Sequence, residues 1–189
     1  MRRVVTGPAE DGGADIVLDG EPPTVVEFGQ YCTTELWVTD SSPLAVPGAA
    51  DPSTRPWELE PPPGGTCFRI VRIAPEAESA RPPSQVAEDP GFLAEHSTST
   101  LDYVLVVSGQ ITLTVGDSEV TLGPGDAVVQ QGTPHDWRNQ GTEPCVLAGV
   151  LISTRRPLSR GVRAPRSAGA RRLGVSGLTA GSHLPCQAS

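Results

Sequence analysis

The feature that most constrains this chain of 189 residues is a series of short β-like runs between residues 101 and 152. The runs are rich in Val, Ile, Leu and Thr, and Gly or Pro turns separate them. No segment shows a helical apolar period of useful length. Short strands at even spacing predict an all-β fold, an antiparallel barrel or jelly roll. We expect these strands at 101–108, 110–115, 119–122, 126–130, 134–139 and 144–152.

The chain divides by composition into three regions that we treat as one domain with extensions. Strand-like runs at 2–6, 14–18 and 34–39 precede a long proline-rich loop, whereas the end of the chain is rich in Arg, Gly, Ser and Pro and poor in apolar residues. Such a tail buries too little apolar surface to become ordered. We predict N-terminal strands and a long loop packing on the barrel over 1–65, the barrel over 66–154 beginning with a strand at 67–73, and an Arg-rich disordered tail over 155–189.

Two segments about 20 residues apart carry the side chains that most suggest chemistry. In the later one, Gly125 and Gly132 precede His135, and three residues then lead to Asn139. This resembles the second conserved motif of the cupin superfamily, Gly-x5-7-Pro-x-Gly-x2-His-x3-Asn, with Gln130 at the position of the Pro.

The earlier segment resembles the first cupin motif, Gly-x5-His-x-His-x3-4-Glu-x6-Gly, in spacing more than in chemistry. His96 stands at the first His, Thr98 at the second and Asp102 at the Glu, and six residues then lead to Gly109. The upstream Gly is one residue off, at Gly91. The resemblance covers roughly residues 66–152 and implies a cupin-type barrel with a degenerate first metal motif.

Strand alternation places His96, Thr98 and Asp102 on one side with apolar residues, which makes that side the barrel interior. The resemblance implies that this strand and the one carrying His135 converge. Two imidazoles and one carboxylate suit iron, zinc, nickel or manganese, so the first hypothesis is a divalent metal held by His96, Asp102 and His135. The alternatives are a metal-free acid–base pair of His135 and Asp102, and a merely structural site.

The remaining candidate residues surround these side chains. Thr98, Thr100, Tyr103, Val104, Gln130 and Trp137 are expected to line the substrate pocket. Arg69 and Arg72 fall on opposite faces of one strand, so one of them could enter the barrel and bind a substrate carboxylate through two parallel hydrogen bonds.

Charge and hydropathy restrict the partners. Residues 1–154 hold 7 Arg and all 22 acidic residues, a net charge of −15, which disfavours binding to nucleic acid. The sequence has no apolar run long enough for a membrane span and no secretory signal, so we expect a cytoplasmic protein. We also expect a homodimer in which the strand at 34–39 extends a neighbouring sheet, with Leu36 and Val38 on one face and Trp37 on the other.

Three functional classes fit this pattern. The first is a small-molecule lyase, dehydratase or isomerase of (secondary) metabolism, which would use a divalent metal or the His–Asp pair. The second is a metal-dependent iron oxygenase. The third is a non-catalytic small-molecule-binding protein, since the cupin barrel hosts all three classes.

Overall fold

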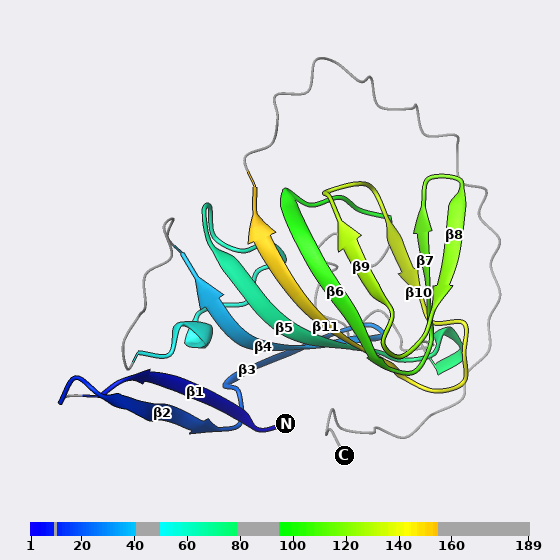
Figure 1. Cartoon of the computed structure of the whole chain (residues 1–189). Helices are drawn as coiled ribbons and strands as arrows, with labels where there is room; N and C mark the ends of the chain where they lie inside the picture. Colours follow the sequence, from blue (N-terminus) through cyan, green and yellow to red (C-terminus); the bar gives the residue numbers. More distant parts are fainter. Residues whose placement is uncertain (10, 41–49, 79–94, 155–189) are drawn as a thin grey trace. The chain divides into compact units, whose positions relative to one another are not determined.

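The structure is a computed structural model that describes residues 1–9, 11–40, 50–78 and 95–154 (Figure 1). Every expected strand is present within a few residues of its expected bounds, and the only helices of the described residues are two short 3-10 turns, η1 (Pro52–Thr54) and η2 (Glu76–Glu78). The all-β prediction is confirmed. The strands are β1 (Arg3–Pro8), β2 (Ala14–Gly20), β3 (Thr24–Phe28), β4 (Tyr31–Thr39), β5 (Thr66–Ile73), β6 (Thr100–Ser108), β7 (Ile111–Val115), β8 (Ser118–Leu122), β9 (Ala127–Gln130), β10 (Asp136–Arg138) and β11 (Cys145–Ser153).

The strands form two main sheets and an N-terminal hairpin, and all of their pairings are antiparallel. The larger sheet has the order β3-β4-β5-β11-β6-β9, and the smaller has the order β10-β7-β8. The non-consecutive neighbours β5, β11 and β6 bring distant segments together, as expected for a jelly roll. Since β3 and β4 belong to the larger sheet, residues before 65 supply strands to it.

The core lies between the two sheets, where apolar side chains alternate inward. Ile73 of β5, Val106 of β6 and Ile111 of β7 are each at most 2% exposed. They pack in one cluster with Leu147 of β11 and Phe28, which ends β3. The interior side of β6 is therefore the one that the sequence predicted, because Asp102 and Val106 are buried while Tyr103 and Leu105 are exposed.

The strand expected to pair across a dimer lies inside its own sheet. β4 pairs with β5 from Tyr31 to Thr39 and with β3 over Tyr31–Glu35. The carbonyl of Leu36 then accepts a hydrogen bond of 2.9 Å from Nη1 of Arg3, in the N-terminal hairpin. From Leu36 to Thr39, β4 has a strand partner on the β5 side only, and the homodimer through residues 34–39 stays a prediction.

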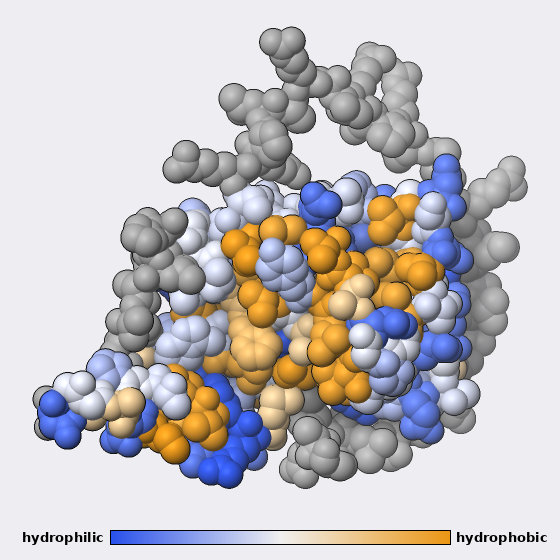
Figure 2. Space-filling model, viewed as in Figure 1, coloured by the Kyte–Doolittle hydropathy of each residue, from blue (hydrophilic) through white to orange (hydrophobic). Residues whose placement is uncertain are grey.

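The outward face of the larger sheet is unusually apolar. Register places Trp37, Phe68, Val150, Tyr103 and Val129 side by side across β4, β5, β11, β6 and β9. Figure 2 shows the apolar side chains that gather over these strands. The described residues contain no helix that is long and apolar enough to cross a membrane. The predicted tail, residues 155–189, lies outside the described residues.

Candidate active site

A cavity of about 110 Å³ opens on the inner face of the larger sheet. Such a volume holds several waters or part of a small molecule. Most of its lining is apolar and comes from β4, β5, β6 and β11, together with the segment that carries Trp57 and Leu59. Among the residues predicted for the site, His96, Thr98, Asp102, Val104, His135 and Trp137 line it.

A pair of backbone hydrogen bonds brings the two histidines together. The amide of His96 donates to the carbonyl of His135 at 3.1 Å, and the amide of His135 donates back at 2.9 Å. The ring centroids are 4.4 Å apart and the ring planes are tilted by 53°. The two cupin-like segments therefore converge at these two residues, in line with the resemblance.

His135 is held in one orientation and is poor at accepting a second proton. Its Nδ1 lies 2.9 Å from the carbonyl oxygen of Thr133, which can only accept, so Nδ1 donates and the lone pair is on Nε2. The side chain is buried, and this burial, together with neighbouring His96, lowers its pKa against the opposing effect of the Thr133 carbonyl. His135 is therefore a neutral base at pH 7.

Asp102 has the opposite tendency. Burial raises the pKa of its carboxyl group, while the Thr100 hydroxyl and the charge of Arg69 act against that rise. Asp102 is 6% exposed, and its Oδ1 has no hydrogen-bond partner among the described residues. Buried polar atoms nearly always have a hydrogen-bond partner, so Oδ1 of this cavity-lining residue can accept a hydrogen bond from a ligand or a water.

Three residues predicted for the pocket lie elsewhere. Tyr103 is 48% exposed on the outer face of β6, because alternation directs it away from Asp102. Thr100 is buried outside the cavity lining, and its hydroxyl lies 2.7 Å from that of Thr98. Gln130 is also buried, and its amide makes a long contact of 3.4 Å with the Thr133 carbonyl, so it supports the turn that orients His135.

The predicted three-ligand metal set is not assembled. No group of three or more His, Cys, Asp or Glu side chains among the described residues lies close enough to hold a metal ion. Thr98 occupies the position of a second histidine, and its hydroxyl is engaged with Thr100. Because these donors do not fit a resident metal, the chemistry below is derived from the side chains alone.

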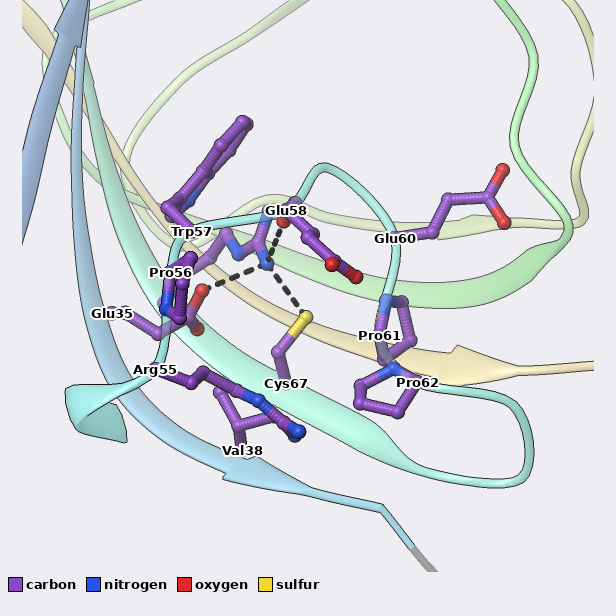
Figure 3. A pocket seen from close by; sticks show the side chains of 11 residues that line it. Glu35, Val38, Arg55, Pro56, Trp57, Glu58, Glu60, Pro61, Pro62 and Cys67 are labelled. Atoms are coloured by element: carbon purple, nitrogen blue, oxygen red, sulfur yellow. Dashed lines mark hydrogen bonds and ion pairs between the residues drawn. The ribbon is translucent and has the colours of Figure 1, made fainter. Parts of the chain in front are cut away.

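The side chain of Arg69 lies in the interior, but its guanidinium group binds other atoms of the protein. It is 4% exposed, and Nη2 pairs with Oε2 of Glu35 at 2.9 Å. Dashed lines in Figure 3 join the same group to the Glu58 carbonyl at 3.2 Å and to Sγ of Cys67 at 2.8 Å. Burial raises the pKa of the Cys67 thiol to about 12, so the thiol stays protonated at neutral pH. The predicted clamp on a substrate carboxylate is therefore not available in this arrangement.

The part of the cavity wall that comes from residues before β5 was not expected from the sequence. Tyr31 and Thr33 of β4 line it, as do Trp57 and Leu59 from the proline-rich loop. The only signal that could have revealed the last two is their chemistry, since Trp57 and Leu59 are large apolar residues in a segment that is otherwise poor in them.

Comparison with known proteins finds a family match in the part of the chain that carries His96, Asp102 and His135. Residues 84–153 match the family model described as "Cupin domain". The phomopsin biosynthesis cluster protein C' of Diaporthe leptostromiformis is 33% identical over 111 residues, which cover 55% of this chain and 51% of that protein. The cupin-domain-containing oxidoreductase srdB of Neurospora crassa is 27% identical over 147 residues, 75% of this chain and 67% of that protein. The chain thus spans about half of the first relative and two thirds of the second.

Solved structures give similar but distant matches. The polyketide cyclase RemF from Streptomyces resistomycificus has a TM-score of 0.42 and 15% identity, covering 71% of this chain and 76% of that one. The cupin domain of an XRE family transcriptional regulator from Enterobacter cloacae has a TM-score of 0.39 and 19% identity, covering 67% of this chain and 99% of that one.

Proposed function

Because this chain belongs to the cupin superfamily, we propose that it binds a small molecule in its barrel cavity and moves a proton on it, as an isomerase or dehydratase. His135 would act as the general base and Asp102 as the general acid. One observation carries the proposal: the two residues line the same cavity, and burial shifts their pKa values toward each other. The lowered pKa of His135 and the raised pKa of Asp102 each favour the uncharged form, and an uncharged imidazole with a protonated carboxyl supplies a base and an acid for a carbonyl compound.

The reaction balances without a cofactor. Nε2 of His135 takes a proton from the carbon next to a substrate carbonyl, and Asp102 gives its proton to the carbonyl oxygen, which forms an enol. Where the enol is conjugated with a further C=C bond, the imidazolium returns its proton to the far carbon while the enol O–H returns its proton to Asp102, which completes an isomerisation. Where the substrate carries a hydroxyl group one carbon further, the enol O–H returns its proton to Asp102 as the carbonyl forms again, and Asp102 passes that proton to the departing hydroxyl group, which leaves as water. The imidazolium of His135 then passes its proton through solvent to Asp102, which restores both groups.

Two other functions are an iron-dependent oxygenase and a non-catalytic binding protein. The relative from Neurospora crassa is named an oxidoreductase, which is the reason to consider the first. The second needs only a cavity that binds the small molecule. An iron oxygenase needs a metal site, and the described donors do not gather one. The acid–base proposal is preferred because it uses only groups that already line the cavity.

The test follows a proton at carbon. The bicyclic ketone 1-tetralone is incubated with the chelator-treated protein in deuterated water, and NMR measures exchange of the protons next to its carbonyl. We expect exchange above the buffer rate, reduced about 100-fold or more in His135→Gln and in Asp102→Asn. Asp117→Asn, at the exposed turn between β7 and β8, is the control and should keep the full rate. Binding of the ketone without exchange would overturn the acid–base proposal and leave a binding protein.

A further inference from the structure

Residues 55–62, named the strap, form no helix or strand and still build part of the cavity wall. Trp57 and Leu59 project from the strap into the lining of the barrel cavity. The family match covers only residues 84–153, so the strap lies outside it. The strap therefore belongs, with β4 and β5, to the part of the cavity wall that the family model does not cover.

The strap is attached to the barrel at several points. Nη1 of Arg69 donates to the Leu59 carbonyl at 3.0 Å, and Nη2 donates to the Glu58 carbonyl at 3.2 Å. The guanidinium carbon lies 5.2 Å from the ring centroid of Trp57, a cation–π distance. At the far end, Oε1 of Glu60 accepts a hydrogen bond of 2.9 Å from the amide of Ser99, just before β6.

Packing complements these polar contacts. The ring of Trp57 lies 4.8 Å from the ring of Phe28, centroid to centroid. Phe28 is 8% exposed and belongs to the core cluster, against which Trp57 and Leu59 both pack. The strap is therefore fixed on one side by β5 through Arg69 and on the other by the core.

Arg69 is itself fixed by buried partners. Glu35 on the neighbouring strand β4 is 3% exposed, and its carboxylate balances the charge of the guanidinium. Both terminal nitrogens of Arg69 donate to protein atoms, and Nε is buried without a hydrogen-bond partner, while the charge of the group is balanced by Glu35. A second cavity beside the strap, lined by Glu35, Trp57 and Cys67 (Figure 3), measures about 20 Å³ and holds little more than one water.

We propose that Arg69 is a positioning residue that acts through the strap, and that Trp57 and Leu59 select a neutral, ring-bearing ligand for the barrel cavity. The aromatic lining of Tyr31, Trp57 and Trp137 favours a planar ring, which stacks offset or edge-on. Charge favours a neutral ligand, since Glu35 already compensates Arg69. The proposal takes only the location of the ligand from the proposed function.

The first experiment loosens the strap without removing the buried charge. Arg69→Lys keeps a cation for Glu35 but cannot donate to two carbonyls as a planar fork does. We expect faster amide hydrogen exchange in residues 55–62 and about tenfold weaker calorimetric binding of 1-tetralone. Arg72→Lys, on the outward face of the same strand, is the control and should change neither. Circular dichroism melting confirms that both variants are folded. Unchanged exchange and affinity in Arg69→Lys would contradict the positioning role.

The second experiment measures selectivity between a two-ring and a three-ring ketone. Leu59→Ala removes three carbons from the cavity wall, and Leu105→Ala removes the same atoms from the outer face of β6, where Leu105 is 45% exposed. We compare the affinities for 1-tetralone and for its three-ring analogue 1,2,3,4-tetrahydrophenanthren-1-one. Leu59→Ala should shift the ratio at least about tenfold toward the larger ketone, and Leu105→Ala should leave it unchanged. An unchanged ratio in Leu59→Ala, or a wild-type protein that binds neither ketone, overturns the selectivity.

Neither readout depends on turnover. If binding and hydrogen exchange respond as expected while proton exchange at carbon is absent, the strap proposal holds and the acid–base function fails. If proton exchange occurs in wild type and in Arg69→Lys at the same rate and affinity, the function holds and the strap proposal fails.

Discussion

At the scale of single residues, His135 gives the sharpest pH prediction. Burial and His96 lower its pKa, so the folded protein resists protonation that the unfolded chain accepts near pH 6.5. His135 therefore contributes stability that is present above pH 6.5 and is lost as pH falls through its lowered folded pKa. NMR of the imidazole carbon-bound protons, assigned with His135→Gln, should place its midpoint below 6.5. A midpoint at or above that value would contradict the description of a buried neutral base.

Thr98 is the residue that separates this site from the metal motif it resembles. It is 4% exposed, and its hydroxyl pairs with that of Thr100. We expect Thr98→His to add the missing imidazole donor and to raise the zinc content of the purified protein, measured by inductively coupled plasma mass spectrometry. Thr114→His, on a partly exposed position of β7, is the control. Stoichiometric metal in the wild type that His135→Ala removes would instead establish the His96, Asp102 and His135 set.

At the scale of elements, the turn at Gly132 allows the two segments of the site to pack closely against each other. Gly132 has a φ of +63°, and a Cβ on it would lie 2.7 Å from the Thr98 carbonyl oxygen. Gly132→Ala should therefore lower the free energy of unfolding by about 1–3 kcal/mol in urea denaturation. Gly123→Ala is the matched control, since no atom lies within 4 Å of its Cβ position. Equal stability of the two variants would show that the close approach is not required.

The strands could largely be predicted because alternation and turn residues act locally. β5 and β6 were expected to within one residue, and the inward face of β6 was assigned correctly, whereas the inward face of β5 was left open. β3 (Thr24–Phe28) was missed although Thr-Val-Val is rich in β-branched residues, because the strand is short and a turn of only two residues joins it to β4. The place of β4 inside the sheet depends on β5, which is almost 30 residues away, and on Arg3.

The candidate site was only partly predictable for the same reason. His96, Asp102 and His135 could be brought to one cavity because the two motifs carry their spacing. The strap could not be assigned to the cavity from the sequence. Trp57 and Leu59 are held by Phe28 and Arg69 through tertiary contacts, and such contacts produce no periodic pattern in a proline-rich segment. Likewise, the distance between donors decides whether a metal set forms, and spacing along the chain does not determine that distance.

At the scale of the whole molecule, the apolar outer face of the larger sheet favours association of two copies, whereas the negative net charge opposes it. Phe68 of β5, Tyr103 and Leu105 of β6 and Val129 of β9 are 41%, 48%, 45% and 59% exposed. Five strands with about three outward residues each outline on the order of 500 Å². Two copies face to face would bury on the order of 1,000 Å² in total, which is the lower limit of a specific interface.

For this outer face we predict a homodimer in which a second copy packs sheet to sheet, a surface other than the one expected at residues 34–39. Residues 1–154 carry a net charge of −15, so two copies repel each other, and salt that screens this repulsion should strengthen the dimer. A basic partner on the same face would bind more weakly in salt. Sedimentation equilibrium should find tighter dimers at high than at low salt. Val129→Glu should yield monomers, whereas Val120→Glu, 48% exposed on the smaller sheet, should not. Monomers at micromolar concentration in both salts would remove the dimer from consideration.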